Sequence, residues 1–167
     1  QGGTSNEIIF DNIVPRGSIL IGHKDYPSGK ALYTKSLDVN LYLNVEDDVV
    51  SPSIQMQFSN DNRNYTAFEQ FNNDKAWQLS AGDGQKIVYV RFRNKAGNIS
   101  EPVSDTIILD TTIPQAAVNV EYIFDGRAKV GFTAADLSSG IDKIYFSVDG
   151  SRPGIPYGGR PLIISTN

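Results

Sequence analysis

The chain has 167 residues, carries a net charge of −4 at neutral pH and has a pI near 4.9. An acidic chain lacks the clustered lysine and arginine side chains that hold phosphates, so we expect no nucleic-acid partner. The absence of cysteine excludes disulfides and cysteine-based zinc sites. No apolar run approaches the ~20 residues that cross a bilayer as a helix, so we expect no membrane insertion in this segment.

Alternation of apolar and polar residues with a period of two is the main pattern along the chain. Leu37–Val45 places every second residue on one apolar face, and Ile87–Phe92 does the same with Val88, Val90 and Phe92. One apolar and one polar face is typical of antiparallel strands packed on one side only. The first part of the chain is therefore predicted to contain seven strands, which are Ile19–Gly22, Leu37–Val45, Ile54–Asn60, Thr66–Phe71, Ala76–Leu79, Lys86–Asn94 and Asp105–Leu109.

Short strands at this spacing predict an all-β sandwich. The inward positions of the alternating segments define its expected core. This core comprises Val39, Leu41, Leu43, Met56, Phe58, Trp77, Val88, Val90 and Phe92.

The sequence also repeats itself. Ser5–Pro15 (SNEIIFDNIVP) matches Ser104–Pro114 (SDTIILDTTIP), with the serine, both isoleucines, the aspartate and the proline identical. A second match joins Phe58–Asn62 to Phe146–Gly150. Offsets of about 90 to 100 residues are typical of arrays of small domains.

These matches divide the chain into three parts. Residues 1–14 are interpreted as the terminal strand of a preceding repeat or as a donor strand, residues 15–112 as a complete sandwich, and residues 113–167 as a partial second one. In the second repeat we expect strands at Ala117–Ile123, Arg127–Ala134, Lys143–Val148 and Leu162–Ile164. Counterparts of the later strands are missing from this sequence. Either the natural chain runs on in both directions, or another chain supplies those strands.

Several segments resemble known extracellular modules. Val90–Asn98 (VRFRNKAGN) resembles the sixth strand and following turn of fibronectin type III domains. Combined with FSNDN, GDG and DTTIP, it is closer to the Ig-like repeats of large bacterial surface and secreted proteins. Gly140–Tyr157 resembles these repeats and the sandwich modules attached to bacterial chitobiases. The resemblance implies tandem Ig-like antiparallel β-sandwiches, the second one incomplete, and an extracellular location at the bacterial cell surface.

Acidic residues gather at the predicted joint between the repeats. Asp110 ends the last strand of the first repeat, and Asp136 and Asp142 flank a loop of the second. Oxygen ligands from both sides of a joint can hold Ca²⁺, so calcium is the one metal we predict there, with a solvated acidic loop as the alternative. No other cofactor is expected. The single histidine, His23, lies in a polar loop without a nucleophile motif, so no catalytic residue is predicted.

Aromatic residues indicate a different kind of site. Tyr65, Phe68 and Phe71 lie around the fourth strand, and Tyr26 and Tyr33 lie in the long Gly22–Ser36 excursion. A row of exposed rings would stack on sugars, whereas core packing would bury them. The excursion is longer than its counterpart in the second repeat, so it is the expected place for a contact specific to the first repeat.

The open sheet of the incomplete second repeat could be completed by a strand from another copy of the chain. Ile8, Ile9 and Phe10 of one copy could add a strand to the open sheet of the next copy. Such a heterologous contact does not close on itself and would build a filament.

Two functions from different classes fit these patterns. The first is a non-catalytic structural or adhesive segment of a larger bacterial surface or secreted protein, acting as a spacer, a stalk, or an element of a filament or sheath. Its partners would be neighbouring repeats or copies of itself, and a surface polysaccharide or another surface protein is a further candidate. The alternative is a carbohydrate-binding accessory module of a secreted polysaccharide-active enzyme.

Overall fold

A computed structural model describes residues 10–22, 32–46, 53–123 and 125–165. Strands are the regular structure in these ranges, and none of the ranges contains a helix that could span a membrane. The chain is thus all-β, as its alternation predicts. It divides into two compact units, Gln1–Leu109 and Asp110–Asn167.

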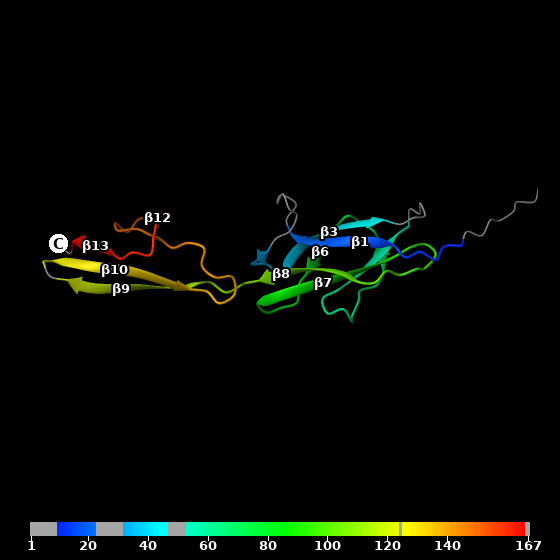
Figure 1. The fold of residues 1–167 in the computed structure, drawn as a ribbon, viewed down its shortest axis with the longest axis horizontal. Coiled ribbons are helices and arrows are strands. Elements are labelled where there is room, and N and C mark those ends of the chain that lie inside the picture. The colour runs from blue at the N-terminus through cyan, green and yellow to red at the C-terminus, as the bar shows by residue number, and fades with distance from the viewer. Residues whose placement is uncertain (1–9, 23–31, 47–52, 124, 166–167) are drawn as a thin grey trace, which may run out of the picture. The chain divides into compact units, whose positions relative to one another are not determined.

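The first unit is a two-layer sandwich (Figure 1). One antiparallel sheet has the order β1-β3-β6, formed by β1 (Arg16–Gly22), β3 (Asp38–Glu46) and β6 (Asp74–Gln78). The other sheet has the order β2-β8-β7-β4-β5. It is formed by β2 (Tyr33–Thr34), β4 (Gln55–Ser59), β5 (Glu69–Gln70), β7 (Gly84–Arg93) and β8 (Val103–Leu109). In this second sheet β2 joins β8 in parallel, and the other pairs are antiparallel.

The core between the two sheets follows the predicted alternation. Most of the predicted core residues are buried in the structure, namely Leu41, Leu43, Met56, Phe58, Val88, Val90 and Phe92. Trp77 and Val39 differ, because they are only partly buried at the border of this core. The Trp77 ring lies 5.4 Å from the Phe58 ring, and its Nε1 donates a hydrogen bond of 2.8 Å to Asn60 Oδ1. The indole therefore packs on one side and keeps its polar atom paired at the edge.

One predicted strand, Thr66–Phe71, is reduced to the two residues of β5. The turn before it is built around Asp61, whose Oδ1 accepts hydrogen bonds of 2.8 Å from the backbone N–H groups of Arg63 and Asn64. These bonds hold the pKa of Asp61 well below its usual range. After the turn the chain returns to β4 at Thr66, whose N–H donates to the Phe58 carbonyl at 2.9 Å, and a regular ladder with β4 begins only at Glu69.

The second unit has one three-stranded sheet and one two-stranded sheet. The first has the antiparallel order β13-β10-β9, from β9 (Gln115–Ile123), β10 (Arg127–Ala135) and β13 (Leu162–Ser165). The second pairs β11 (Tyr145–Phe146) with β12 (Ile155–Pro156). A ring cluster fills the space beside them, in which Phe132 lies 5.3 Å from Phe146 and 5.1 Å from Tyr157.

The two units share a plan. The sheet β9-β10-β13 corresponds to β1-β3-β6, and the pair β11–β12 corresponds to β4–β5. No counterpart of β7 or β8 occurs among the described residues of the second unit. The described part of the second unit thus lacks the strands that build most of the second layer of the first unit.

At Gly17 the two layers of the first unit approach each other closely. A Cβ atom built on Gly17 would overlap Cε2 of Phe92 and would lie 2.7 Å from the backbone oxygen of Asn44. Phe92 is fully buried, so its ring has little room to move away. Only a residue without a side chain fits at this point of β1.

We expect Gly17→Ala to destabilise the first unit by about 1–3 kcal/mol, because the added methyl group overpacks the core. Urea unfolding followed by the fluorescence of Trp77, the single tryptophan, measures this unit. Ser18→Ala is the control, since Ser18 is exposed on the same strand and its midpoint should stay close to that of the parent chain. Equal midpoints for Gly17→Ala and Ser18→Ala would contradict the close approach.

Candidate functional site

The turn that follows β7 is shaped to receive another segment. In Asn94–Asn98, the Asn94 N–H donates to the Asn98 carbonyl at 3.1 Å, and the Gly97 N–H donates to the Asn94 carbonyl at 3.1 Å. Gly97 has a φ of 94°, in the region where a glycine avoids a steric penalty. The turn brings the side chains of Asn94 and Asn98 together.

These two asparagines hold the connector that precedes β1. Asn94 Nδ2 donates to Asp11 Oδ2 at 2.8 Å and to the Ile13 carbonyl at 3.0 Å. Asn98 Nδ2 donates to the Asp11 carbonyl at 2.9 Å. We call Asp11, Asn94 and Asn98 the linker clamp.

Asn94 is buried, and its amide is fully used. Its nitrogen makes the two bonds to the connector, and its Oδ1 accepts the Asn98 N–H at 2.9 Å. Because an unpaired buried amide is costly, a fully paired one selects a single arrangement of its partners. Pro15, at the end of the connector, is also fully buried. The path from Asp11 to Pro15 is therefore fixed on the first unit.

Asp110 occupies the position in the second connector that Asp11 occupies in the first. Its Oδ1 accepts the Thr112 N–H at 3.1 Å, just as Asp11 Oδ1 accepts the Ile13 N–H at 2.9 Å. The Asp110 carboxyl is also within hydrogen-bonding reach of Asp136.

The Asp136 carboxylate lies in a nest of backbone donors. Its Oδ1 accepts the N–H groups of Ser138 and Ser139, each at 3.0 Å, and of Gly140 at 3.3 Å. The bonds from Ser139 and Ser138 are the main reason that the pKa of Asp136 lies below its usual value.

The predicted calcium ligands are therefore brought together in part. Asp110 and Asp136 meet, but the exposed Asp142 does not complete a cluster with them, because no group of three histidine or acidic side chains converges within the described ranges. Ca²⁺ normally takes six to eight oxygen ligands, and two carboxylates supply only part of such a set. Calcium binding at Asp110, Asp136 and Asp142 stays a prediction.

Thermal unfolding of the full chain tests the calcium prediction. Ca²⁺ held by Asp110 and Asp136 would raise the Tm in millimolar CaCl₂, because a ligand that binds only the folded state stabilises it. The rise would disappear in Asp110→Asn and would be absent with MgCl₂ at equal ionic strength. A Tm that is the same with and without Ca²⁺ would remove calcium from this site.

The aromatic residues around β5 do not form an open row. Arg91 lies over the Tyr65 ring, 4.5 Å from its centroid, and Arg93 lies over Phe68 at 3.9 Å. Phe71 packs on the core against Phe92, with 6.1 Å between the ring centroids. Each of the three rings thus has a protein partner and is partly buried.

A groove of about 550 Å³ lies where β2 meets the first strands of the sandwich. Its lining includes Tyr33, Lys35, Asp38 and Asn40, with Ile107 as part of an apolar floor. This groove lies at the end of the Gly22–Ser36 excursion, which the sequence singles out as the place for a specific contact. Tyr33 is 51% exposed there.

Some predicted residues lie outside the described ranges, namely Ile8, Ile9, His23 and Tyr26. Phe10 is described, and it is 87% exposed. The linker clamp, in contrast, was not predicted. Its sequence signals are the repeated Asp-x-x-x-Pro pattern of the two connectors and the NKAGN turn.

Comparison with solved structures finds a likeness to the crystal structure of the PKD1 domain of Vibrio anguillarum Epp. The TM-score is 0.42 at 14% sequence identity, and the match covers 61% of this chain and all of that domain. No protein-family model matches the sequence, and no curated protein matches it. The assignment of a β-sandwich rests on the sheets and the core described above.

Proposed function

We propose that this chain is a non-catalytic structural segment of a bacterial extracellular Ig-like array, where it acts as a spacer, a stalk or a filament element. The linker clamp is the observation that carries this proposal. An array transmits shape and force from one domain to the next only if its connectors hold a direction. A connector that is fixed by hydrogen bonds on a sandwich meets that requirement.

The clamp has the chemistry of a stiff joint. Three hydrogen bonds join the connector to the two asparagines, and one of them ends on the Asp11 carboxylate. Each neutral bond contributes about 0.5–1.5 kcal/mol net, and a bond to a charged group contributes about 1.5–3 kcal/mol. Pro15 adds a fixed φ to the same short segment. A flexible Gly/Ser linker would have none of these restraints.

The composition supports the same role. The net negative charge favours solubility. Because the chain has no cysteine, its fold does not depend on the redox conditions outside the cell. The amide nitrogens of Asn94 and Asn98 and the Asp11 carboxylate all take part in hydrogen bonds within the turn and the connector, which suits a structural joint better than a reactive site.

We expect Asn98→Ala to loosen the connector, because it leaves the Asp11 carbonyl without its donor. A loss of about 1 kcal/mol corresponds to roughly fivefold faster amide exchange at Ile13. Hydrogen exchange of the full chain measures this rate. Lys95→Ala is the control, since Lys95 is exposed in the same turn. Unchanged exchange at Ile13 in Asn98→Ala would contradict a stiff, clamped joint.

The groove beside Tyr33 favours a second candidate, a carbohydrate-binding accessory module. An exposed tyrosine with Asp38 and Asn40 nearby offers a stacking face and hydrogen-bonding groups, which is the usual composition of a sugar subsite. The arginines over Tyr65 and Phe68 leave Tyr33 as the better platform.

Native gels cast with soluble polysaccharides test this second candidate. If the groove binds sugar, a gel containing the right polysaccharide will retard the chain, and Tyr33→Ala will run without retardation. Tyr145→Ala is a matched control, because Tyr145 is 49% exposed and lies in the other unit. Retardation that survives in Tyr33→Ala, or is lost equally in both variants, would rule out the groove.

A further inference from the structure

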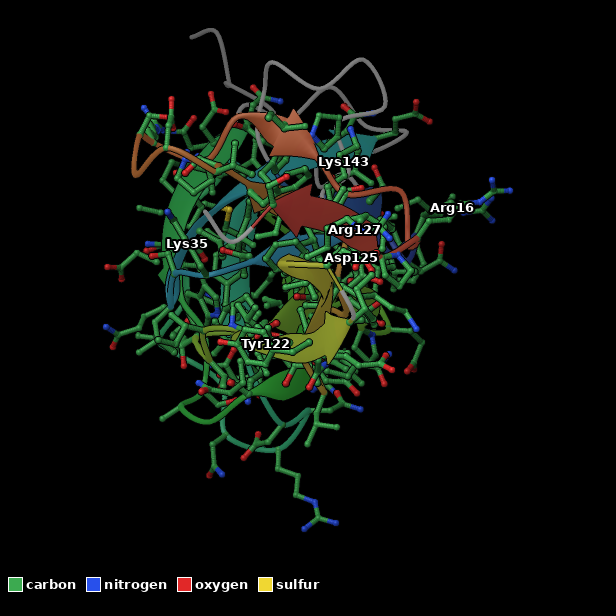
Figure 2. The ribbon with its side chains drawn as sticks, turned by 90° about the vertical axis from the view of Figure 1, so that its left-hand side faces the viewer. Arg16, Lys35, Tyr122, Asp125, Arg127 and Lys143 are labelled. Carbon is green, nitrogen blue, oxygen red and sulfur yellow. The ribbon has the colours of Figure 1, made fainter. Side chains whose placement is uncertain are left out.

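Strand β9 presents an exposed apolar stripe, whereas the equivalent stripe of β1 in the first unit is buried. Each of β1 and β9 directly follows a connector proline, and each pairs with the next long strand along the chain. Ile19 and Ile21 of β1 are 5% and 0% exposed, whereas Val118 and Val120, which lie 99 residues later, are 60% and 51% exposed. Tyr122 continues this stripe and is labelled in Figure 2. We call Val118, Val120 and Tyr122 the β9 stripe.

In the first unit, β8 is the strand that covers the equivalent face. Ile107 and Leu109 of β8 are buried. Asp105, two residues before Ile107, accepts the backbone N–H of Ile21 through its Oδ2 at 2.9 Å. This bond satisfies a donor on the free side of β1, because β3 is the only strand that pairs with β1 among the described residues. Within the described ranges β9 likewise pairs with one strand, β10, and nothing plays the part of β8.

One other segment of the sequence carries the β8 pattern. Ser5–Asp11 matches Ser104–Asp110, so Ile8 corresponds to Ile107 and Phe10 to Leu109. Asn6 takes the place of Asp105, and its amide oxygen can accept a backbone N–H in the same way. The segment therefore has apolar groups at the two inward positions and an acceptor at the position that closes the edge.

The surface of β9 also differs from β1 in a way that selects its occupant. Gly17 of β1 is replaced in β9 by Ala116, and Gly17 is the residue on which Phe92 of β7 packs without room for a methyl group. A strand that carries phenylalanine at the Phe92 position would clash with Ala116. A strand of the β8 kind has no such contact to make.

We propose that Ser5–Asp11 of a second copy of this chain docks along β9 as β8 lies along β1. Ile8 and Phe10 cover the β9 stripe, and the Asn6 amide oxygen accepts the backbone N–H of Val120. The donor segment and the β9 stripe are different surfaces of the chain. Each copy can therefore give and receive once, so the contact is heterologous and the assembly is open-ended. The inference goes beyond the proposed spacer role, because it names a partner and a mode of assembly.

Sedimentation velocity of the full chain over a range of concentrations tests the proposal. We expect species larger than a dimer that grow with concentration. Phe10→Asp and Val120→Asp each place a charge in the contact and should return the chain to a monomer. Ile9→Asp and Asn119→Asp are matched controls that add the same charge on the opposite faces of the same two segments, and they should still associate.

A chain that is monomeric at every concentration would overturn the proposal. Association that persists in Phe10→Asp or Val120→Asp, or that is lost equally in the controls, would also overturn it. Phe10 and Val120 are exposed, so their variants should fold, and Trp77 fluorescence with circular dichroism verifies this. Hydrogen exchange at Ile13 reports the linker clamp separately, so the failure of this proposal and of the spacer role can be told apart.

Discussion

The buried amide of Asn94 is the interaction on which the connector of the first unit depends. It sits where β7 ends, and its three polar positions join the turn to the incoming chain. A buried amide tolerates no unpaired group without a cost of about 1–3 kcal/mol, so the turn and the connector are restricted to one mutual arrangement. β1 begins directly after the connector, so the same amide determines where the first strand of the sandwich enters.

The two units show what a sandwich gains from its second layer. The inward residues of β1 are buried and those of β9 are exposed, because β7 and β8 lie over β1 but have no described counterpart over β9. The ring cluster around Phe132 compensates in part, since it covers β10. It leaves β9 uncovered. The exposure of β9 thus follows from the lack of β7 and β8 counterparts in the described part of the second unit, and the stripe residues of β9 are as apolar as a core strand requires.

Alternation predicted the long strands and most of the core because a strand with one buried face must show it locally. β2 and β12 have two residues each, which is too short for any period to appear. In the predicted strand Thr66–Phe71, Phe68 lies under Arg93, where a cation–π contact replaces core burial. The clamp was not predicted, because Asn94 and Asp11 are 83 residues apart, and neither the NKAGN turn nor the repeated Asp-x-x-x-Pro pattern indicates that the two meet.

The repeated aspartate of the connectors explains how one motif can serve different neighbours. In both connectors Oδ1 accepts the N–H two residues later, which closes a local turn. The same carboxyl group also contacts a residue outside its own turn. In the first connector Oδ2 meets Asn94, and in the second the carboxyl meets Asp136, whose own charge is held by three backbone donors. The local turn sets the direction of the chain, and the outward contact attaches it to whichever loop the domain offers. An array built on this motif can vary its domains and keep its connectors.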